Sequence, residues 1–153
     1  MRDGKAVSPW HDISIRPAGK SDEFYTFVNE IPAGSFEKIE VCTHEPWNPL
    51  KQDSKKGKPR LYGLKTAFNY GCFPQTWENP WRHSKRIAAV GDGDPVDAVE
   101  LGWLGGGVGP LPLGAVAAVR VLGCLALIDE GEVDWKVTLL CPPSLFVIIC
   151  LPS

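Results

Sequence analysis

The chain has 153 residues and a formal net charge of −2, and 44% of its residues are hydrophobic while 22% are charged. These values are typical of one globular domain, and such a small net charge neither indicates nor excludes a nucleic-acid partner. The five cysteines are scattered without a Cys-x-x-Cys pair, which excludes a disulfide scaffold and predicts reduced thiols inside the cell, in the cytoplasm. The three histidines are too dispersed for a recognisable zinc pattern.

The first third of the chain predicts two strands, at residues 27–32 and 36–41, joined by a short turn. Side chains alternate between the two faces of a strand, so Lys38 and Glu40 are expected to share a face. A single Lys-x-Glu pair on a strand is usually a weak surface contact. The pair therefore indicates a site only in combination with the other charged residues described below.

A run rich in cations follows, with five of them in residues 51–60. Most runs of this kind are solvated loops. Arg60 is the exception, because it is expected to begin a strand, where its planar guanidinium group can hold a phosphate with two hydrogen bonds.

Residues 92–97 read Asp-Gly-Asp-Pro-Val-Asp and place three carboxylates within six residues. In an extended segment Asp92 and Asp94 point to the same side, and Pro95 bends the chain and re-aims Asp97. Carboxylates that converge repel one another unless cations lie between them, and oxygen ligands favour magnesium, manganese or calcium. An exposed acidic turn is the alternative interpretation. An EF-hand loop is excluded, because the position that requires glycine is Asp97.

The C-terminal half predicts a hairpin after a glycine-rich connection at residues 102–114. An apolar strand at 119–128 ends at Asp129, and a second strand starts at Asp134. This hairpin is expected to set Asp129 opposite Asp134 and to place Lys136 on the same face as Asp134. A charged hairpin tip without a function is the alternative.

Two of these segments resemble the motifs of a known family. Residues 92–97 resemble the signature of the soluble inorganic pyrophosphatases, and residues 127–136, Leu-Ile-Asp-Glu-Gly-Glu-Val-Asp-Trp-Lys, resemble their second acidic block. The short connection between Arg60 and Tyr70 is similar to that of the plant and algal plastid branch. The resemblance stops after Val137, so we expect a pyrophosphatase domain at residues 1–137 and an apolar tail outside the family pattern at 138–153.

The resemblance implies a mainly β (α+β) fold, a five-stranded OB-like β-barrel whose C-terminal helical part is missing or replaced. It also implies hydrolysis of pyrophosphate to two phosphates with Mg²⁺. The residues that match the family positions fall into three groups by role. Those expected to bind metal are Asp92, Asp97, Asp129 and Asp134, with Glu30 and Glu40 acting mainly through metal-bound waters. Asp94 is expected to accept a proton from the nucleophile or to orient it, and the residues expected to contact phosphate oxygens are Lys38, Arg60, Tyr70 and Lys136.

Two other functions stay open. The chain could be an inactive fragment that binds magnesium and associates with full-length subunits, and a homo-oligomer is compatible with either reading. It could also bind single-stranded nucleic acid through interleaved basic and aromatic residues between Lys58 and Tyr70. The acidic cluster argues against this second alternative, because it would repel a phosphate backbone. A plastid-type relationship makes the chloroplast the alternative to the cytoplasm.

The apolar run at residues 145–151 is far shorter than the roughly 20 residues that span a bilayer, so no membrane helix is expected. The run is uncharged and rich in β-branched residues. It is therefore expected to promote aggregation or to add a strand that covers a sheet edge.

Overall fold

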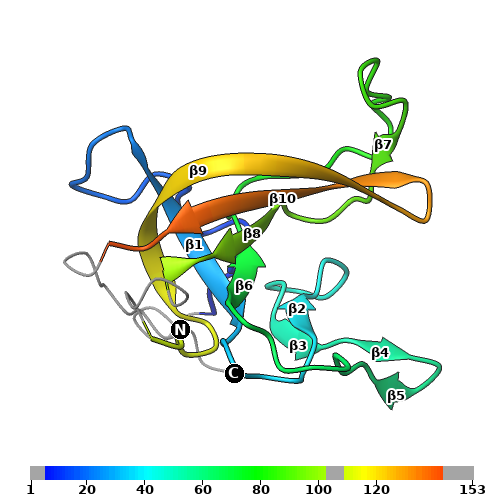
Figure 1. Cartoon of the computed structure of the whole chain (residues 1–153), viewed down its shortest axis with the longest axis horizontal. Coiled ribbons are helices and arrows are strands. Elements are labelled where there is room, and N and C mark those ends of the chain that lie inside the picture. The colour runs from blue at the N-terminus through cyan, green and yellow to red at the C-terminus, as the bar shows by residue number, and fades with distance from the viewer. Residues whose placement is uncertain (1–5, 103–108, 143–153) are drawn as a thin grey trace.

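The structure is a computed structural model that describes residues 6–102 and 109–142 (Figure 1). The described part is mainly β, as the sequence predicted, and contains no α-helix. Its strands are β1 (Phe24–Ile31), β2 (Ile39–Val41), β3 (Leu50–Gln52), β4 (Ser54–Lys55), β5 (Lys58–Pro59), β6 (Asn69–Cys72), β7 (Val90–Gly91), β8 (Asp97–Glu100), β9 (Val116–Asp129) and β10 (Glu132–Leu140).

The main sheet has the order β7-β10-β8-β6-β1-β9, with an additional pairing between β10 and β9. Because of that pairing, β1, β6, β8, β10 and β9 each pair with two others of these five strands, and the series of pairings returns to its start. Strand β10 also pairs with β7. The length of β9 makes this possible: its first part pairs with β1 and its second part with β10. Figure 1 shows β9 as a long curved strand that lies along β10 and then bends toward β1.

The two strands predicted at residues 27–32 and 36–41 are confirmed in part. The first segment lies in β1, but β2 begins only at Ile39 and pairs with β3. Both edges of β1 are already paired, with β6 on one side and β9 on the other, so no edge is left for β2. Arg60 also differs from the expectation, because it follows the short strand β5 (Lys58–Pro59) and does not begin a strand.

The core lies on the inner side of the main sheet and is built from strands distant in sequence. Phe27, Val119 and Leu139 are fully buried in one cluster, and Val28 is buried in a second. Strands β1 and β6 approach closely at Gly71, where a side-chain Cβ would lie 1.9 Å from the Val28 carbonyl oxygen. Only glycine fits there, and this close approach brings Tyr70 on β6 beside β1.

Two earlier predictions lie at least partly outside the described residues. They concern the glycine-rich connection, of which residues 103–108 are not described, and the apolar run at 145–151. Among the residues that are described, no helix is both long and apolar enough to cross a membrane.

Candidate active site

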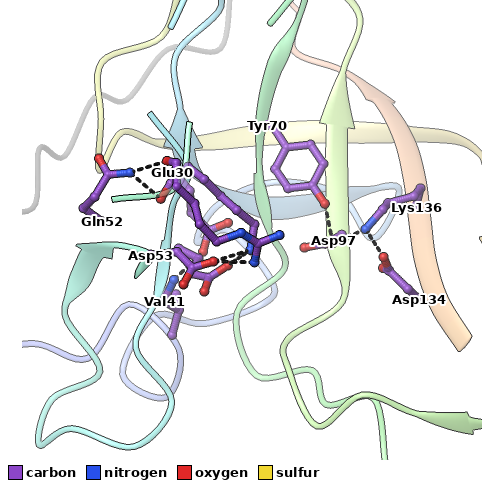
Figure 2. A network of polar contacts seen from close by, with 11 residues as sticks. Glu30, Val41, Gln52, Asp53, Tyr70, Asp97, Asp134 and Lys136 are labelled. Carbon is purple, nitrogen blue, oxygen red and sulfur yellow. Dashed lines mark hydrogen bonds and ion pairs between the residues drawn. The ribbon is translucent and has the colours of Figure 1, made fainter. Parts of the chain in front are cut away.

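The centre of the site lies where β8 and β10 pair in parallel. Their register sets Lys136 beside Asp97, and the Lys136 ammonium group contacts one carboxylate oxygen of Asp97 and one of Asp134 (Figure 2). Asp134 and Lys136 are two residues apart on β10, so they share a face, as the alternation of the strand predicted. The Tyr70 hydroxyl group on β6 donates a hydrogen bond to the same oxygen of Asp97.

The loop before β8 brings two further carboxylates to this centre. The Asp92 side chain accepts a hydrogen bond from the Asp94 backbone N–H at 2.9 Å, which fixes the turn between them. Burial, with the charge of Asp92 next, raises the pKa of Asp94 to about 6. Burial also raises the pKa of Asp97 to about 6, although the Lys136 ammonium group opposes the shift. The carboxylates therefore lie close enough to destabilise one another's charge in the absence of a cation.

A second group of charges surrounds Lys38. Its ammonium group contacts Glu40 and lies 3.1 Å from the Asp53 carboxylate, which also accepts a hydrogen bond from Arg60 at 2.6 Å. The Asp53 backbone N–H donates to the Lys38 carbonyl, and the Arg60 N–H donates to the Asp53 carbonyl, both at 2.8 Å. Burial would raise the pKa of Asp53, but Lys38 and Arg60 outweigh it and lower that pKa.

Asp53 thus positions two of the cations predicted to contact phosphate, although no role was predicted for it from the sequence. The available signal was a single carboxylate inside a run of cations, between Gln52 and Ser54. Gln52 supports the same arrangement, because its side-chain amide donates to the carbonyl groups of Lys38 and Arg60 (Figure 2).

Glu30 connects the two groups of charges. It is buried on β1 and accepts a hydrogen bond from the Val41 backbone N–H at 2.9 Å. Burial, followed by the charge of Asp97, raises the pKa of Glu30 to about 8, and Glu40 contributes in the same direction. The hydrogen bond from Val41 ties Glu30 to β2, the strand that carries Glu40, and the charge of Asp97 acts on Glu30 from the other group. The two groups therefore belong to one site.

Glu78 also belongs to the site, although no role was predicted for it from the sequence. Its carboxylate accepts hydrogen bonds from the Trp135 backbone N–H at 3.0 and 3.3 Å. Its own backbone N–H donates to the Asp94 carbonyl, and its carbonyl accepts from Gly93, each at 2.9 Å. Burial is the main cause that raises the pKa of Glu78 to about 8, and the charges of Asp92 and Asp134 add to it. Glu78 therefore joins the loop at residues 92–97 to β10.

Asp129 is not opposite Asp134, and this prediction was wrong. Asp129 pairs with Glu132, while Asp134 pairs with Leu127. The turn consists of two residues, Glu130 and Gly131, both with positive φ, as in the two-residue turns that suit hairpins. Asp129 consequently lies on the face that carries Asp134 but two residues further toward the exposed tip.

The donor chemistry of the site fits a hard divalent cation. The side chains at its centre offer carboxylate oxygens, with no thiol or imidazole group among the residues predicted to bind metal. One oxygen of Asp134, Oδ1, is buried and has no hydrogen-bond partner among the described residues, which is the environment that a bound cation or its water would satisfy. A surface pocket lined by Trp10, His11, Gln75, Thr76 and Trp77 contains none of the predicted site residues.

A cluster of carboxylates bordered by lysines and an arginine is the charge pattern of metal-dependent enzymes that act on phosphate groups. The family model described as inorganic pyrophosphatase matches residues 27–142. The chain belongs to the inorganic pyrophosphatase family. The match ends at residue 142 and β10 continues to Leu140, so the strand runs past the boundary expected at residue 137.

Similar proteins include chloroplastic and other members of the family. The chain is 45% identical over 135 residues to soluble inorganic pyrophosphatase 6, chloroplastic, from Arabidopsis thaliana, covering 88% of this chain and 42% of that protein. It is also 45% identical over 139 residues to the inorganic pyrophosphatase of Homo sapiens, covering 88% of this chain and 45% of that protein. The chain thus spans less than half the length of these curated relatives.

Solved structures give the same relationship. The type I inorganic pyrophosphatase of Toxoplasma gondii superimposes with a TM-score of 0.80 at 44% identity, over 88% of this chain and 58% of that one. An N-terminally truncated vacuolar soluble pyrophosphatase of Trypanosoma cruzi, solved in complex with PPi, matches with a TM-score of 0.79 at 41% identity, over 96% of this chain and 57% of that one. The resemblance seen in the sequence motifs is therefore confirmed.

Proposed function

We propose that this chain hydrolyses inorganic pyrophosphate to two phosphates in the presence of Mg²⁺. The observation that carries the proposal is the position of Lys136 between Asp97 and Asp134, beside the loop that holds Asp92 and Asp94. Pyrophosphate carries several negative charges, so a site that hydrolyses it needs both carboxylates for metal ions and cations for the remaining charge. This site offers both.

The metal-binding residues in this proposal are Asp92, Asp97, Asp129 and Asp134. Glu30 and Glu40 would act mainly through metal-bound waters. When bound, Mg²⁺ would supply Lewis acidity and lower the pKa of a coordinated water. Asp94 would accept a proton from the attacking water, because a pKa of about 6 keeps it deprotonated near neutral pH yet basic enough to take up a proton.

The phosphate-binding residues are Lys38, Arg60, Tyr70 and Lys136. Lys38 and Lys136 are paired with carboxylates in the structure, at Glu40 and Asp53 and at Asp97 and Asp134 respectively. Once those carboxylates bind metal ions, the two ammonium groups can leave them and bind phosphate oxygens instead. Arg60 is held by one hydrogen bond to Asp53 and its side chain is 46% exposed, so its other donors remain available to substrate.

The ring of pairings among β1, β6, β8, β10 and β9 supports a five-stranded OB-like barrel as the scaffold of this site. For the compartment, the cytoplasm remains our proposal, with the chloroplast as the alternative that the chloroplastic relatives support.

A second candidate is an inactive chain that binds metal and associates with another subunit. Exposed apolar side chains on β9, among them Leu122, Leu125 and Ile128, favour this candidate because such side chains often mark contact surfaces. The same surface would serve a homo-oligomer. Turnover separates this candidate from the enzyme.

The deciding experiment is phosphate release from pyrophosphate by the purified chain, measured with Mg²⁺ and with excess chelator. We expect release with Mg²⁺ and none in chelator. Ca²⁺ should bind yet inhibit, because its looser coordination geometry misplaces the nucleophile. Equal release in chelator would contradict the metal requirement, and binding of magnesium without any release would favour the second candidate. Salt-sensitive binding of a single-stranded oligonucleotide would instead support the nucleic-acid alternative.

A further inference from the structure

We propose that Cys42, His44 and Glu45 form a second metal site, one that binds a thiophilic divalent cation of the zinc class. Each of the three side chains offers one ligand atom, and these atoms lie within 4.8 Å of one another. The cluster lies in the turn between β2 and β3. Its donors are a thiol, an imidazole and a carboxylate, whereas the site described above relies on carboxylates.

The distance between sulfur and nitrogen fits a zinc ion. Zinc lies about 2.3 Å from a thiolate and about 2.0 to 2.1 Å from an imidazole nitrogen, so a tetrahedral angle separates the two donors by about 3.6 Å. Cys42 Sγ lies 3.5 Å from His44 Nε2. The two side chains can therefore bind one ion with little movement, and Glu45 supplies a third ligand while a fourth position stays open to water.

The backbone of the turn is held in place before any ion binds. Asn48 is buried, and its side-chain amide donates to the carbonyl groups of Cys42 and Thr43, each at 3.3 Å. The Cys42 N–H donates to the Pro49 carbonyl at 2.9 Å, and the Asn48 N–H donates to the Glu45 carbonyl at 3.1 Å. Since both ends of the turn are tied, little conformational entropy is lost when the three side chains converge.

Glu45 Oε1 also contacts the Lys51 ammonium group at 2.6 Å, and this contact competes with metal binding. Both side chains are exposed, and exposed ion pairs contribute little to stability. This contact therefore does not prevent Glu45 from binding a metal ion.

Ligand chemistry separates the two sites. Thiolate and imidazole ligands select zinc and related ions, while carboxylates suit magnesium. The thiol of Cys42 must lose its proton on binding, so metal uptake should release a proton. Saturating Mg²⁺ should therefore fill the carboxylate site and leave the Cys42 site open to a thiophilic ion.

The test is a titration with Co²⁺, a spectroscopic substitute for zinc, in saturating Mg²⁺ and a thiol-free buffer. We expect a thiolate-to-cobalt charge-transfer band that saturates at one equivalent and disappears when Zn²⁺ is added. Cys42→Ser should abolish the band, and His44→Asn should weaken Co²⁺ binding at least about tenfold. Cys124→Ser is the matched control, since Cys124 is exposed on β9, and it should leave the band unchanged.

The proposal is overturned if the wild-type chain gives no band, or if the band persists in Cys42→Ser or disappears in Cys124→Ser. His44 is exposed, so His44→Asn tests the site even if Cys42→Ser fails to fold, as circular dichroism would show. An unchanged Co²⁺ affinity in a folded His44→Asn variant would also overturn it. The readout is metal binding, so it does not depend on whether the chain hydrolyses pyrophosphate.

Discussion

The Glu78 carboxylate accepts a hydrogen bond from the backbone N–H of Trp135, with the two atoms 3.0 Å apart. Trp135 stands between Asp134 and Lys136 on β10, and the backbone of Glu78 is bonded to Gly93 and Asp94 in the acidic loop. One buried side chain therefore sets the position of two functional segments relative to each other. Glycine at position 91 permits this packing, because a side-chain Cβ there would lie 2.4 Å from the Glu78 backbone.

This relationship predicts different outcomes for two substitutions of Glu78. Glu78→Ala leaves the half-buried Trp135 N–H without its Glu78 partner and should lower the free energy of unfolding by about 1 to 3 kcal/mol. It should also reduce turnover, because the loop and β10 lose their connection. Glu78→Gln keeps an acceptor oxygen and should retain most of both properties. Urea unfolding and phosphate release measure them, and equal loss in the two variants would show that the negative charge matters more than the hydrogen bond.

Replacing Asp94 or Asp97 with asparagine should affect different properties, turnover in the first case and metal affinity in the second. Asp94→Asn should lower turnover by about two orders of magnitude or more, the usual scale for loss of a general base, with metal affinity largely retained. Asp97→Asn should weaken metal binding, because Asp97 lies at the centre of the carboxylates between Tyr70 and Lys136. Isothermal titration with Mg²⁺ and turnover at saturating Mg²⁺ separate the two effects. Equal loss of metal binding in both variants would contradict this division of roles.

Stability of the metal-free chain should fall as the pH rises. Glu30 has an ordinary pKa of 4.5 and a raised pKa of about 8 in the folded chain, so the folded state binds its proton more tightly. This proton contributes fully to the free energy of unfolding below about pH 4.5, and its contribution is lost as the pH rises through about 8. The loss is on the order of a few kcal/mol. Thermal midpoints measured in chelator between these limits test this decrease.

The matched variant for this experiment is Glu30→Gln, which keeps an acceptor for the Val41 N–H but has no proton to lose in this range. It should show a smaller decrease with pH than the wild-type chain. Added Mg²⁺ should stabilise the wild-type chain more at high pH, because the cation binds deprotonated carboxylates. A pH profile identical in the two proteins would exclude Glu30 as the source.

The local contacts of the site could be predicted from the sequence because they depend on strand geometry alone. Lys136 contacts Asp134 and Lys38 contacts Glu40, and each pair is two residues apart. Alternation along an extended chain is enough to bring such residues to one face. The mainly β fold followed from the same patterns and from the family motifs.

The long-range contacts could not be predicted in this way. The register of β9 and β10 depends on which two residues form the turn, and a turn at Glu130 and Gly131 moves Asp129 opposite Glu132. Glu78 lies 57 residues before Trp135, so no local pattern indicates their contact. The absence of a hairpin between β1 and β2 likewise depends on β6 and β9, which occupy both edges of β1.

Arg60 should contribute mainly to substrate binding. Arg60→Ala should raise the KM for pyrophosphate by about ten- to a hundredfold, the range expected for one lost hydrogen bond to a charged group. Lys55→Ala is the control, because Lys55 is an exposed cation on β4 in the same run. Steady-state kinetics at fixed Mg²⁺ distinguish the two variants. If both raised KM equally, the run would act through its total charge and not through the position of Arg60.

The exposed part of β9 should bind hydrophobic dyes and promote self-association. Leu122, Leu125 and Ile128 are 56%, 60% and 53% exposed along the outer half of β9. Side chains alternate along a strand, so Leu125 and Ile128 lie on opposite faces, and the three residues make an apolar strip that is exposed on both faces of β9. Leu125→Thr together with Ile128→Thr places a polar but β-branched, strand-compatible side chain at both positions and should lower dye fluorescence and the apparent mass in light scattering. Leu64→Ser is the control, since Leu64 is 82% exposed but lies outside the strip. A wild-type chain that is monomeric and binds no dye would contradict this prediction, whereas an equal effect of Leu64→Ser would show that total exposed apolar area matters and not the strip on β9.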